Sequence, residues 1–234
     1  WIKELNATKV LLVTDKGLVK AGLMNDIKKY IIAEGLEIIV FDKVEENPTE
    51  QNVCEGRDII IKDNIDIVVA LGGGSPMDAA KAMAILSPHE GSIANYELGL
   101  KPLTQPGLPV IVIPTTAGTG SEATMGSVIT DQKTHRKFDV VSRLMAPKLA
   151  LVDPLLTQML PAALTAATGM DALTHSVEGY TATLASPLTD ALHLKAITMI
   201  GNDLPRAYHD GSDKEARSNV MMASMIAGIG FPNS

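Results

Sequence analysis

Short apolar runs alternate with longer amphipathic segments over the first part of the chain. Residues 10–14 form an apolar run rich in β-branched side chains, and the segment 22–35 then places apolar residues at helical spacing. The same alternation predicts strands at 10–14, 37–41, 65–71 and 110–113, and helices at 22–35, 53–64 and 76–86. Strands that are apolar on both faces and alternate with helices are typical of a parallel sheet covered on both sides. The pattern therefore predicts a doubly wound α/β domain with a parallel sheet, an architecture that binds dinucleotides.

The pattern changes near Pro154, because the residues from Leu155 onward are rich in Ala, Leu, Met and Thr at helical spacing and contain no further convincing strand. We therefore predict two domains, an α/β domain at 1–154 and an all-helical domain at 155–234. Residues 228–234 resemble a segment that continues, so we expect the helical domain to be truncated in this chain.

Composition narrows the classes of partner. Lys and Arg number 20 against 27 Asp and Glu, and the net charge of −7 argues against partners that are nucleic acids or anionic membranes. The single cysteine, Cys54, excludes an internal disulfide and a zinc ribbon. The apolar stretches are shorter than a bilayer crossing, and no signal peptide is evident. We expect a cytoplasmic protein that binds small molecules.

A glycine-rich turn is the strongest local signal for a ligand site. Gly72, Gly73, Gly74, Ser75 and Pro76 separate the apolar strand 65–71 from the helix that follows. Glycines let the backbone approach a phosphate closely, and the start of a helix offers free N–H groups and a partial positive charge. The alternative is a tight turn that needs positive φ, and the spacing is not GxGxxG. Three consecutive glycines after a parallel strand favour the first interpretation, a site for the pyrophosphate of a dinucleotide.

Two other segments that follow predicted strands offer polar groups. The loop that begins at Pro114 is rich in threonine, glycine and serine, so it can supply hydrogen-bond donors to the same ligand, although an ordinary Ser/Thr-rich loop has the same composition. Asp15 follows the first strand, where a carboxylate accepts hydrogen bonds from ribose hydroxyls and repels a 2′-phosphate. The alternative for Asp15 is a solvated turn residue.

Asp171 and His175 lie four residues apart on one face of a predicted helix, a spacing that lets both reach one metal ion. The alternative is an aspartate near a helix start and a histidine with an ordinary hydrogen-bond partner. Glu178 and His193 are candidates for further ligands. The remaining histidines are expected at the surface, because their surroundings are polar and loop-like: His89, His135 and His209.

Taken in order along the chain, these motifs resemble the iron-dependent (group III) alcohol dehydrogenase family, which has a dehydroquinate-synthase-like fold. The resemblance covers essentially the whole chain. It rests on the linked strings Thr-Asp-Lys at 14–16, Asn-Pro-Thr at 47–49, Gly-Gly-Gly-Ser-Pro-Met-Asp at 72–78, Pro-Thr-Thr-Ala-Gly-Thr at 114–119 and Ala-Ala-Thr-Gly-Met-Asp-Ala-Leu-Thr-His at 166–175.

The resemblance implies that NAD is the cofactor. The glycine turn and Asp78 would hold its pyrophosphate side, Asn47 would approach the adenosine, and Asp15 would disfavour the phosphate of NADP. The threonines of the second loop would line the cofactor cleft beside Lys137. The implied cofactor-binding residues are Asp15, Asn47, Gly73, Gly74, Ser75, Asp78, Thr115, Thr116, Thr124 and Lys137.

For the metal, the resemblance implies that Asp171 and His175 are the first two of four ligands to Fe(II), with Zn(II) as the alternative. The family supplies two more histidines from a region beyond residue 234, and it begins with an additional strand or hairpin ahead of residue 1. The implied reaction is hydride transfer between a small alcohol or aldehyde and NAD in a homo-oligomer, a dimer or larger. The alternatives are a zinc-type polyol dehydrogenase, a lyase similar to dehydroquinate synthase, and a catalytically silent fragment that binds a nucleotide.

Overall fold

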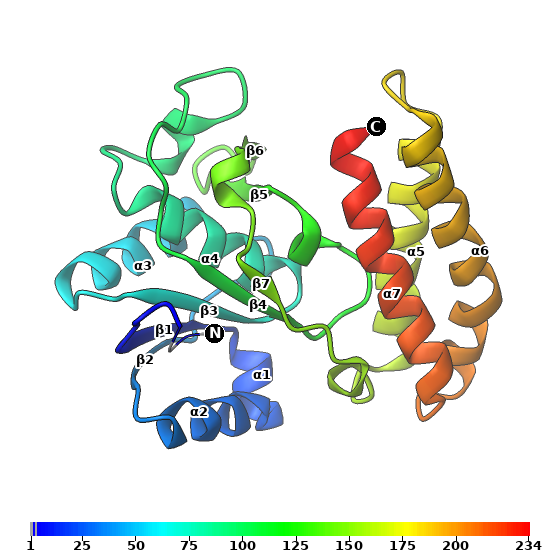
Figure 1. The fold of residues 1–234 in the computed structure, drawn as a ribbon, viewed down its shortest axis with the longest axis horizontal. Helices are drawn as coiled ribbons and strands as arrows, with labels where there is room; N and C mark the ends of the chain where they lie inside the picture. The colour runs from blue at the N-terminus through cyan, green and yellow to red at the C-terminus, as the bar shows by residue number, and fades with distance from the viewer. Residues whose placement is uncertain (1, 3) are drawn as a thin grey trace. The chain divides into compact units, whose positions relative to one another are not determined.

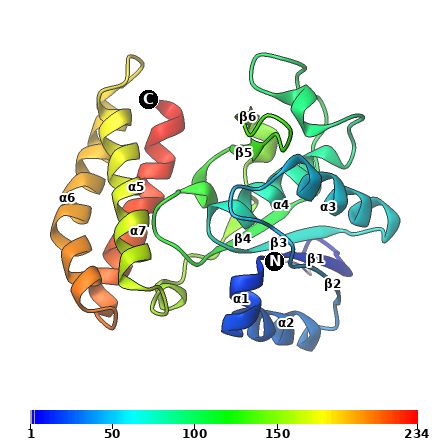
Figure 2. The ribbon, with the colours of Figure 1, turned by 180° about the vertical axis from the view of Figure 1, so that it is seen from behind.

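The computed structural model describes residues 2 and 4–234, and the contacts of the chain divide it into two compact units (Figures 1 and 2). The sheet unit consists of Trp1–Ile113 with Met125–Ala150, and the helical unit consists of Pro114–Thr124 with Leu151–Ser234. The sequence pattern did not indicate that residues 114–124 contact the helical unit. The ranges 1–154 and 155–234 stay a prediction about domains.

Five parallel strands form the sheet of the first unit, in the order β2-β1-β3-β4-β7. In register, Val10 of β1 pairs with Ile38 of β2 on one side and with Ile67 of β3 on the other. The strands predicted from apolar runs are present with ends shifted by no more than a few residues, and β7 was missed because two residues carry no readable pattern. Their bounds are β1 Lys9–Val13, β2 Glu37–Phe41, β3 Ile67–Gly72, β4 Val110–Pro114 and β7 Leu149–Ala150.

Helices cover both faces of this sheet, with α1 and α2 on one face and α3 and α4 on the other (Figures 1 and 2). The helix predicted at 22–35 corresponds to α2, whereas α1 was not predicted. Gly22, in a left-handed conformation at φ +83°, separates the two helices. The helix predicted at 53–64 begins three residues earlier, since Thr49 caps it by accepting the N–H of Asn52. The bounds are α1 Lys16–Ala21, α2 Leu23–Ala33, α3 Glu50–Lys62 and α4 Gly74–Leu86.

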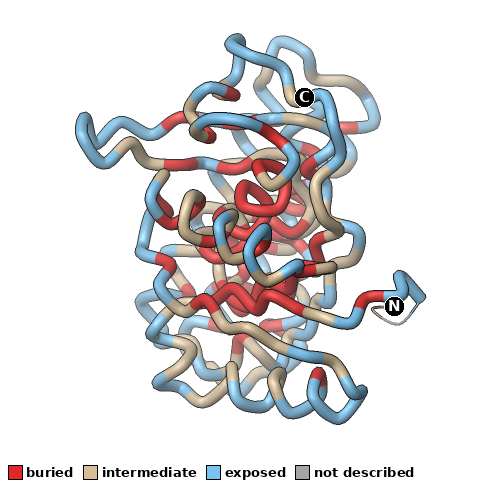
Figure 3. The backbone as a smooth tube through the Cα atoms, turned by 90° about the vertical axis from the view of Figure 1, so that its left-hand side faces the viewer, coloured by how far each residue is buried: buried red, intermediate tan, exposed pale blue. Residues whose placement is uncertain are grey.

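The core of the sheet unit follows from the apolar strands. Leu11, Val68 and Val112, from three strands of the sheet, are buried with Met77 and Met83 of α4 in one cluster. In Figure 3 the buried segments, drawn in red, gather near the centre of the trace. The α/β architecture with a parallel sheet, expected from the alternation of apolar runs and helices, is confirmed.

An antiparallel hairpin of two strands, β5 Gly126–Thr130 and β6 Lys137–Val141, also belongs to the sheet unit. Its inward positions Ile129, Phe138 and Val140 are buried, while Val128 and Lys137 are exposed. The sequence pattern did not predict this hairpin, because each strand has few apolar residues and a polar loop separates them. Short 3-10 helices complete the chain: η1 Ile93–Tyr96, η2 Ser121–Ala123, η3 Arg143–Met145, η4 Pro154–Thr157 and η5 Phe231–Asn233.

Three long helices dominate the helical unit, α5 Ala162–Tyr180, α6 Pro187–His209 and α7 Lys214–Gly230, so the all-helical prediction is confirmed. Alanines such as Ala172, Ala196 and Ala223 fill much of its core, and small side chains let helices approach closely. In the part of the chain that the structure describes, no helix combines the length and apolar character that a membrane crossing requires.

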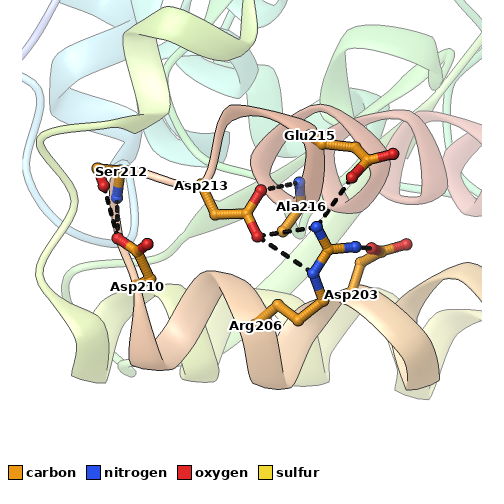
Figure 4. Close-up of polar contacts among 7 residues, drawn as sticks. All are labelled: Asp203, Arg206, Asp210, Ser212, Asp213, Glu215 and Ala216. Carbon is orange, nitrogen blue, oxygen red and sulfur yellow. Dashed lines mark hydrogen bonds and ion pairs between the residues drawn. The ribbon is translucent and has the colours of Figure 1, made fainter.

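Arg206 ties the end of α6 to the start of α7 (Figure 4). Its guanidinium donates to Asp203 at 2.8 Å, to Asp213 at 2.9 and 3.1 Å, and to Glu215 at 2.9 Å. Asp213 also caps α7 by accepting the N–H of Ala216 at 3.0 Å, and this bond and then Arg206 hold the pKa of Asp213 below its ordinary value. The turn between the two helices is therefore fixed by charge-assisted hydrogen bonds.

Asp66 joins the start of β1 to the start of β3. One carboxylate oxygen accepts three hydrogen bonds, from the N–H and hydroxyl of Thr8 at 2.7 and 2.8 Å and from the N–H of Lys9 at 2.9 Å. These bonds, with Thr8 first, hold the pKa of Asp66 below its ordinary value. A carboxyl with a lowered folded-state pKa stabilises the fold above its unfolded-state pKa, and the contribution is lost as the pH falls through the folded-state value.

We expect Asp66→Asn to lower the free energy of unfolding at pH 7 by about 1 kcal/mol, because solvent around this partly exposed carboxylate weakens its hydrogen bonds. Urea unfolding of both proteins at pH 7 and near pH 3 measures this difference. The difference in unfolding free energy should narrow below about pH 4, where the Asp66 carboxyl of the unfolded wild-type chain begins to be protonated, and it should be lost as the pH falls through the lowered folded-state pKa. Asp63→Asn, at the end of α3, is the control. If the difference in unfolding free energy between the two proteins stayed constant with pH, the stabilising role assigned to the ionised Asp66 would be contradicted.

Candidate functional site

The glycine turn is shorter than the sequence suggested. β3 ends at Gly72 and α4 begins at Gly74, so Gly73 alone separates them and acts as the N-cap without a side-chain hydrogen bond. The first amides of a helix have no partner within it, and the N-cap residue Gly73 has no side chain that could accept from them. Pro76 has no N–H, which leaves the amides of Gly74 and Ser75 at the start of a helix of 13 residues. This is the geometry that binds phosphate groups.

The strand order places this turn at a topological switch point. β1 lies between β2 and β3, so the connections after β1 and β3 leave the sheet at neighbouring positions. Val13 pairs with Ala70, and Thr14 and Asp15 therefore follow β1 at the same edge as Gly72. In open α/β sheets, ligands bind at the carboxyl ends of the strands at such a point. Asp15 and the glycine turn, both predicted to contact a cofactor, are brought together here.

Thr14 and Asp15 have different environments at this edge. Asp15 caps α1 by accepting the N–H of Leu18 at 3.0 Å, so it is more than a solvated turn residue. The hydroxyl oxygen of Thr14 is buried and has no hydrogen-bond partner among the described residues. An unpartnered buried hydroxyl costs free energy unless a ligand or water bonds to it. Thr14 belongs to the Thr-Asp-Lys string at 14–16 but was not predicted to contact the cofactor, although its place directly after an apolar strand was a signal.

Asn47 and Ser75 meet in the sheet unit. The N–H of Asn47 donates to the hydroxyl oxygen of Ser75 at 3.2 Å, and Asn47 holds a left-handed conformation at φ +62°. A neighbouring cavity of about 420 Å³ is lined by charged and polar residues that include Lys16, Lys43 and Asn52. The predicted adenosine side and the predicted phosphate side are therefore linked by a direct hydrogen bond.

Asp78 and Lys137, the other residues predicted for the cofactor in this unit, have contrasting surroundings. Lys137 is exposed at the first position of β6. The Asp78 carboxylate pairs with Lys81 at 3.1 Å and accepts the N–H of Val128 at 2.9 Å. Sequence reasoning missed Lys81, because only the fold shows that this cation is buried.

The predicted threonines lie in the helical unit, on the segment Pro114–Thr124. Thr115 is buried, and the hydroxyl oxygen of Thr116 is buried without a partner among the described residues. Thr124 donates its hydroxyl to the carbonyl of Ser121 at 3.3 Å. Of these three threonines, Thr116 has the hydroxyl that is buried without a hydrogen-bond partner among the described residues. A polar ligand would satisfy it.

Asp171 and His175 face each other across one turn of α5. The Nε2 atom of His175 lies 3.9 Å from Oδ1 of Asp171, and their side chains are 25% and 45% exposed. With metal–ligand distances of about 2.0–2.2 Å, Asp171 and His175 are close enough that both would serve as ligands of one ion. The His175 ring also lies against Phe231, with centroids 5.0 Å apart.

The two other residues considered as metal ligands, Glu178 and His193, are not grouped with Asp171 and His175. Glu178 is exposed on α5, and His193 is buried on α6 between Gly179 and Gly230. Burial lowers the pKa of His193. Within the described residues, no three or more His, Cys, Asp and Glu side chains are grouped to hold a metal ion.

The prediction that His89 is a surface residue was wrong, whereas His135 and His209 are exposed as expected. One ring nitrogen of His89, Nδ1, lies 2.7 Å from the carbonyl of Ile85, and Nε2 accepts the N–H groups of Thr104 and Gln105 at 3.2 and 3.4 Å. The polar loop that suggested exposure folds over the ring and satisfies it, so His89 has a structural role.

Comparisons with known proteins agree with this arrangement. Residues 1–154 match the family described as "Iron-containing alcohol dehydrogenase", and residues 165–234 match "Fe-containing alcohol dehydrogenase family, C-terminal". The chain is 44% identical to the 1,3-propanediol dehydrogenase of Citrobacter freundii over 234 residues, which cover 99% of this chain and 60% of that protein. The chain thus spans about 60% of the length of curated relatives that it matches.

Solved structures show the same similarity. A crystal structure of 1,3-propanediol oxidoreductase matches with a TM-score of 0.95 and 44% identity over 99% of this chain and 60% of that one. The sulfoacetaldehyde reductase of Bifidobacterium kashiwanohense, solved in complex with NAD+, matches with a TM-score of 0.91 and 36% identity over 98% and 60%. The resemblance inferred from the motifs is confirmed, and the chain belongs to the iron-containing alcohol dehydrogenase family.

Proposed function

We propose that this chain is the cofactor-binding part of an NAD-dependent, metal-assisted alcohol dehydrogenase that transfers hydride between a small alcohol or aldehyde and the nicotinamide. The observation that carries the proposal is the uncapped start of α4 at the switch point between β1 and β3. A relative solved with NAD+ and the family match support the same function.

In the sheet unit, the amides of Gly74 and Ser75 would bind the pyrophosphate, and Gly73 keeps the approach open because it has no side chain. Ser75 accepts from Asn47, so its own hydroxyl proton is available for a phosphate oxygen. Asn47 would lie on the adenosine side, and Asp15 on the ribose. NAD, when bound, supplies the redox chemistry as the hydride acceptor or donor.

Other predicted residues complete the proposed assignment. The hydroxyls of Thr115, Thr116 and Thr124 would bond to the cofactor, and the unpartnered oxygen of Thr116 fits that role. Lys137 would offer a positive charge from β6. Asp171 and His175 would supply two ligands to Fe(II) or Zn(II), and their 3.9 Å separation fits two donors to one ion. The metal would act as a Lewis acid on the alcohol or carbonyl oxygen.

The substrate proposal stays at the class of small alcohols and aldehydes, because related proteins carry names as different as 1,3-propanediol dehydrogenase and lactaldehyde reductase. We also propose a homo-oligomer, a dimer or larger.

The function is tested by titrating the protein with NADH and by following alcohol-dependent NADH formation in the same sample with added Fe(II) or Zn(II). Failure to bind NADH would overturn the proposal, and binding without turnover would support the silent nucleotide-binding alternative.

The structure suggests how to test the role of Asp15 without disturbing its cap. Serine also caps helices well, so Asp15→Ser keeps a hydrogen bond to the N–H of Leu18 and removes the negative charge. We expect the ratio of NADP to NAD affinity to rise by about tenfold or more, because a carboxylate near a 2′-phosphate repels it. Titrations with NADH and NADPH measure the ratio, Asp26→Asn on α2 is the control, and an unchanged ratio would contradict the assignment.

The metal assignment predicts the behaviour of the double variant Asp171→Ala, His175→Ala. Both side chains are partly exposed, so their removal should leave the fold intact. We expect affinity for Fe(II) or Zn(II) to fall by about tenfold or more, since the double variant removes both donors of the proposed pair. Metal analysis after dialysis provides the measurement, with Glu178→Ala as the control. Stoichiometric tight metal in the double variant would refute the site.

A further inference from the structure

A buried ion pair lies one turn beyond the glycine turn. The Lys81 side chain is completely buried on α4, and its ammonium lies 3.1 Å from Oδ1 of Asp78, whose side chain is 14% exposed. A buried charge costs several kcal/mol unless it is paired and hydrogen-bonded, and replacing such a pair with apolar residues is often neutral or stabilising. Fold stability alone therefore does not account for a lysine among Ala79, Ala80 and Ala82.

The same aspartate holds the hairpin β5–β6. Its second carboxylate oxygen, Oδ2, accepts the N–H of Val128 at 2.9 Å, and its backbone carbonyl accepts the hydroxyl of Ser127 at 2.9 Å. Lys81 and the hairpin thus contact opposite oxygens of one carboxylate, and the ammonium fixes the orientation in which Asp78 accepts from Val128. Two consecutive hairpin residues are bonded to a single residue of α4.

The hairpin depends on such contacts for its position. It forms a sheet of two strands, and a two-stranded hairpin is marginally stable unless it packs on other elements. Its apolar side packs in a cluster with α3 and α4 through Ile129 and Phe138. Apolar packing is weakly directional, whereas the bonds from Asp78 fix the strand register against the helix.

A second set of bonds connects the hairpin to the predicted adenosine side. The N–H of Thr130 donates to the carbonyl of Pro48 at 2.8 Å, and Asn47, the preceding residue, donates to Ser75 at the start of α4. Thr130 pairs in register with Lys137. The start of α4, the 47–49 turn and the base of the hairpin therefore form one closed network that carries Asn47, Ser75 and Lys137.

We infer that the buried Asp78–Lys81 ion pair positions the hairpin β5–β6, and with it Lys137, against the glycine turn for cofactor binding. Asp78 acts as a positioning residue, and its carboxylate faces Lys81 and Val128 rather than the phosphates, which it would repel. This inference rests on the proposed NAD-binding function and replaces the direct pyrophosphate contact predicted for Asp78.

Two double variants test it by removing both charges of the ion pair together. Asp78→Leu, Lys81→Met removes the ion pair and the acceptor for Val128, whereas Asp78→Asn, Lys81→Met removes both charges but keeps an amide oxygen that accepts from Val128. Glu37→Gln, which breaks the exposed ion pair with Lys9, is the control. NADH titration by fluorescence and hydrogen–deuterium exchange of the hairpin without cofactor are measured on each protein.

For the leucine variant we expect NADH to bind about tenfold more weakly, the size of one lost contact with a charged group, and the hairpin amides to exchange faster. The Asp78→Asn, Lys81→Met variant should bind NADH within about twofold of wild type. Adding Lys137→Met to the Asp78→Leu, Lys81→Met variant should lower NADH affinity by less than adding it to the wild type. Equal losses in both double variants, or wild-type affinity in the leucine variant, would overturn the inference while leaving NAD binding intact. A wild-type protein that does not bind NADH would overturn the proposed function and the inference with it.

Discussion

Replacing Gly72 with alanine is expected to weaken NADH binding by roughly a hundredfold. A Cβ at this position would lie 2.5 Å from Cγ and 2.8 Å from Cβ of Pro76. The proline ring belongs to the first turn of α4 and has no rotamer that moves it away, so the backbone must shift. That shift displaces the amides of Gly74 and Ser75, and the loss of about 3 kcal/mol of hydrogen bonding to a phosphate corresponds to about two decades in Kd.

The measurement is an NADH titration together with a thermal unfolding curve, which separates loss of the site from loss of the fold. Gly99→Ala is the matched control, because Gly99 has positive φ, +88°, as Gly72 does at +157°, and both lie in the sheet unit. A Cβ on Gly99, however, would meet nothing within 4 Å. The control should lose some stability and keep its affinity. If Gly72→Ala binds NADH as tightly as Gly99→Ala, the glycine turn is not the phosphate site.

Local sequence patterns predicted the sheet well because their physical causes are local. A run such as Val68, Val69 and Ala70 is apolar on both faces, so it is buried in any fold that it can join, and the glycine after it ends the strand. The glycine turn was predictable for the same reason, since strand, turn and helix are consecutive. The short helix α1 was missed because its six residues are too few to show a helical period.

Features that depend on distant residues were not predictable. The hairpin β5–β6 is defined by pairing between Gly126 and Val141 and by packing against helices far away in sequence. Burial of Lys81 and His89 depends on residues that contact them in the fold. Lys81 pairs with Asp78, and the loop at 104–105 contacts His89. Residue type alone places both at a surface. The sequence therefore supplied the residues predicted to contact the cofactor, which stay predictions, whereas it did not supply the bonds that hold these residues in place.

The second large effect is expected in the helical unit, at Gly228 of α7. The backbone of α7 touches the loop that carries Thr115 and Thr116, since a Cβ on Gly228 would lie 2.6 Å from the carbonyl oxygen of Gly120 and 2.8 Å from its Cα. Gly120 is itself in the left-handed region at φ +62°. Both contacts are with backbone atoms, so no side-chain rotation relieves them. Gly228→Ala must push the loop and the helix apart.

We expect Gly228→Ala to lower the free energy of unfolding by about 3 kcal/mol, the upper part of the usual range for overpacking, although alanine favours a helix by about 1 kcal/mol. For a protein of this size that loss lowers Tm by roughly 6–12 °C. Gly201→Ala on α6 is the control, because a Cβ there meets nothing within 4 Å, and its Tm should rise slightly. The contrast isolates backbone contact from helix propensity, since both substitutions are glycine to alanine within a helix. Equal Tm values for the two variants would show that α7 and the loop separate at little cost, and the close approach at Gly120 would then not hold the threonines in place.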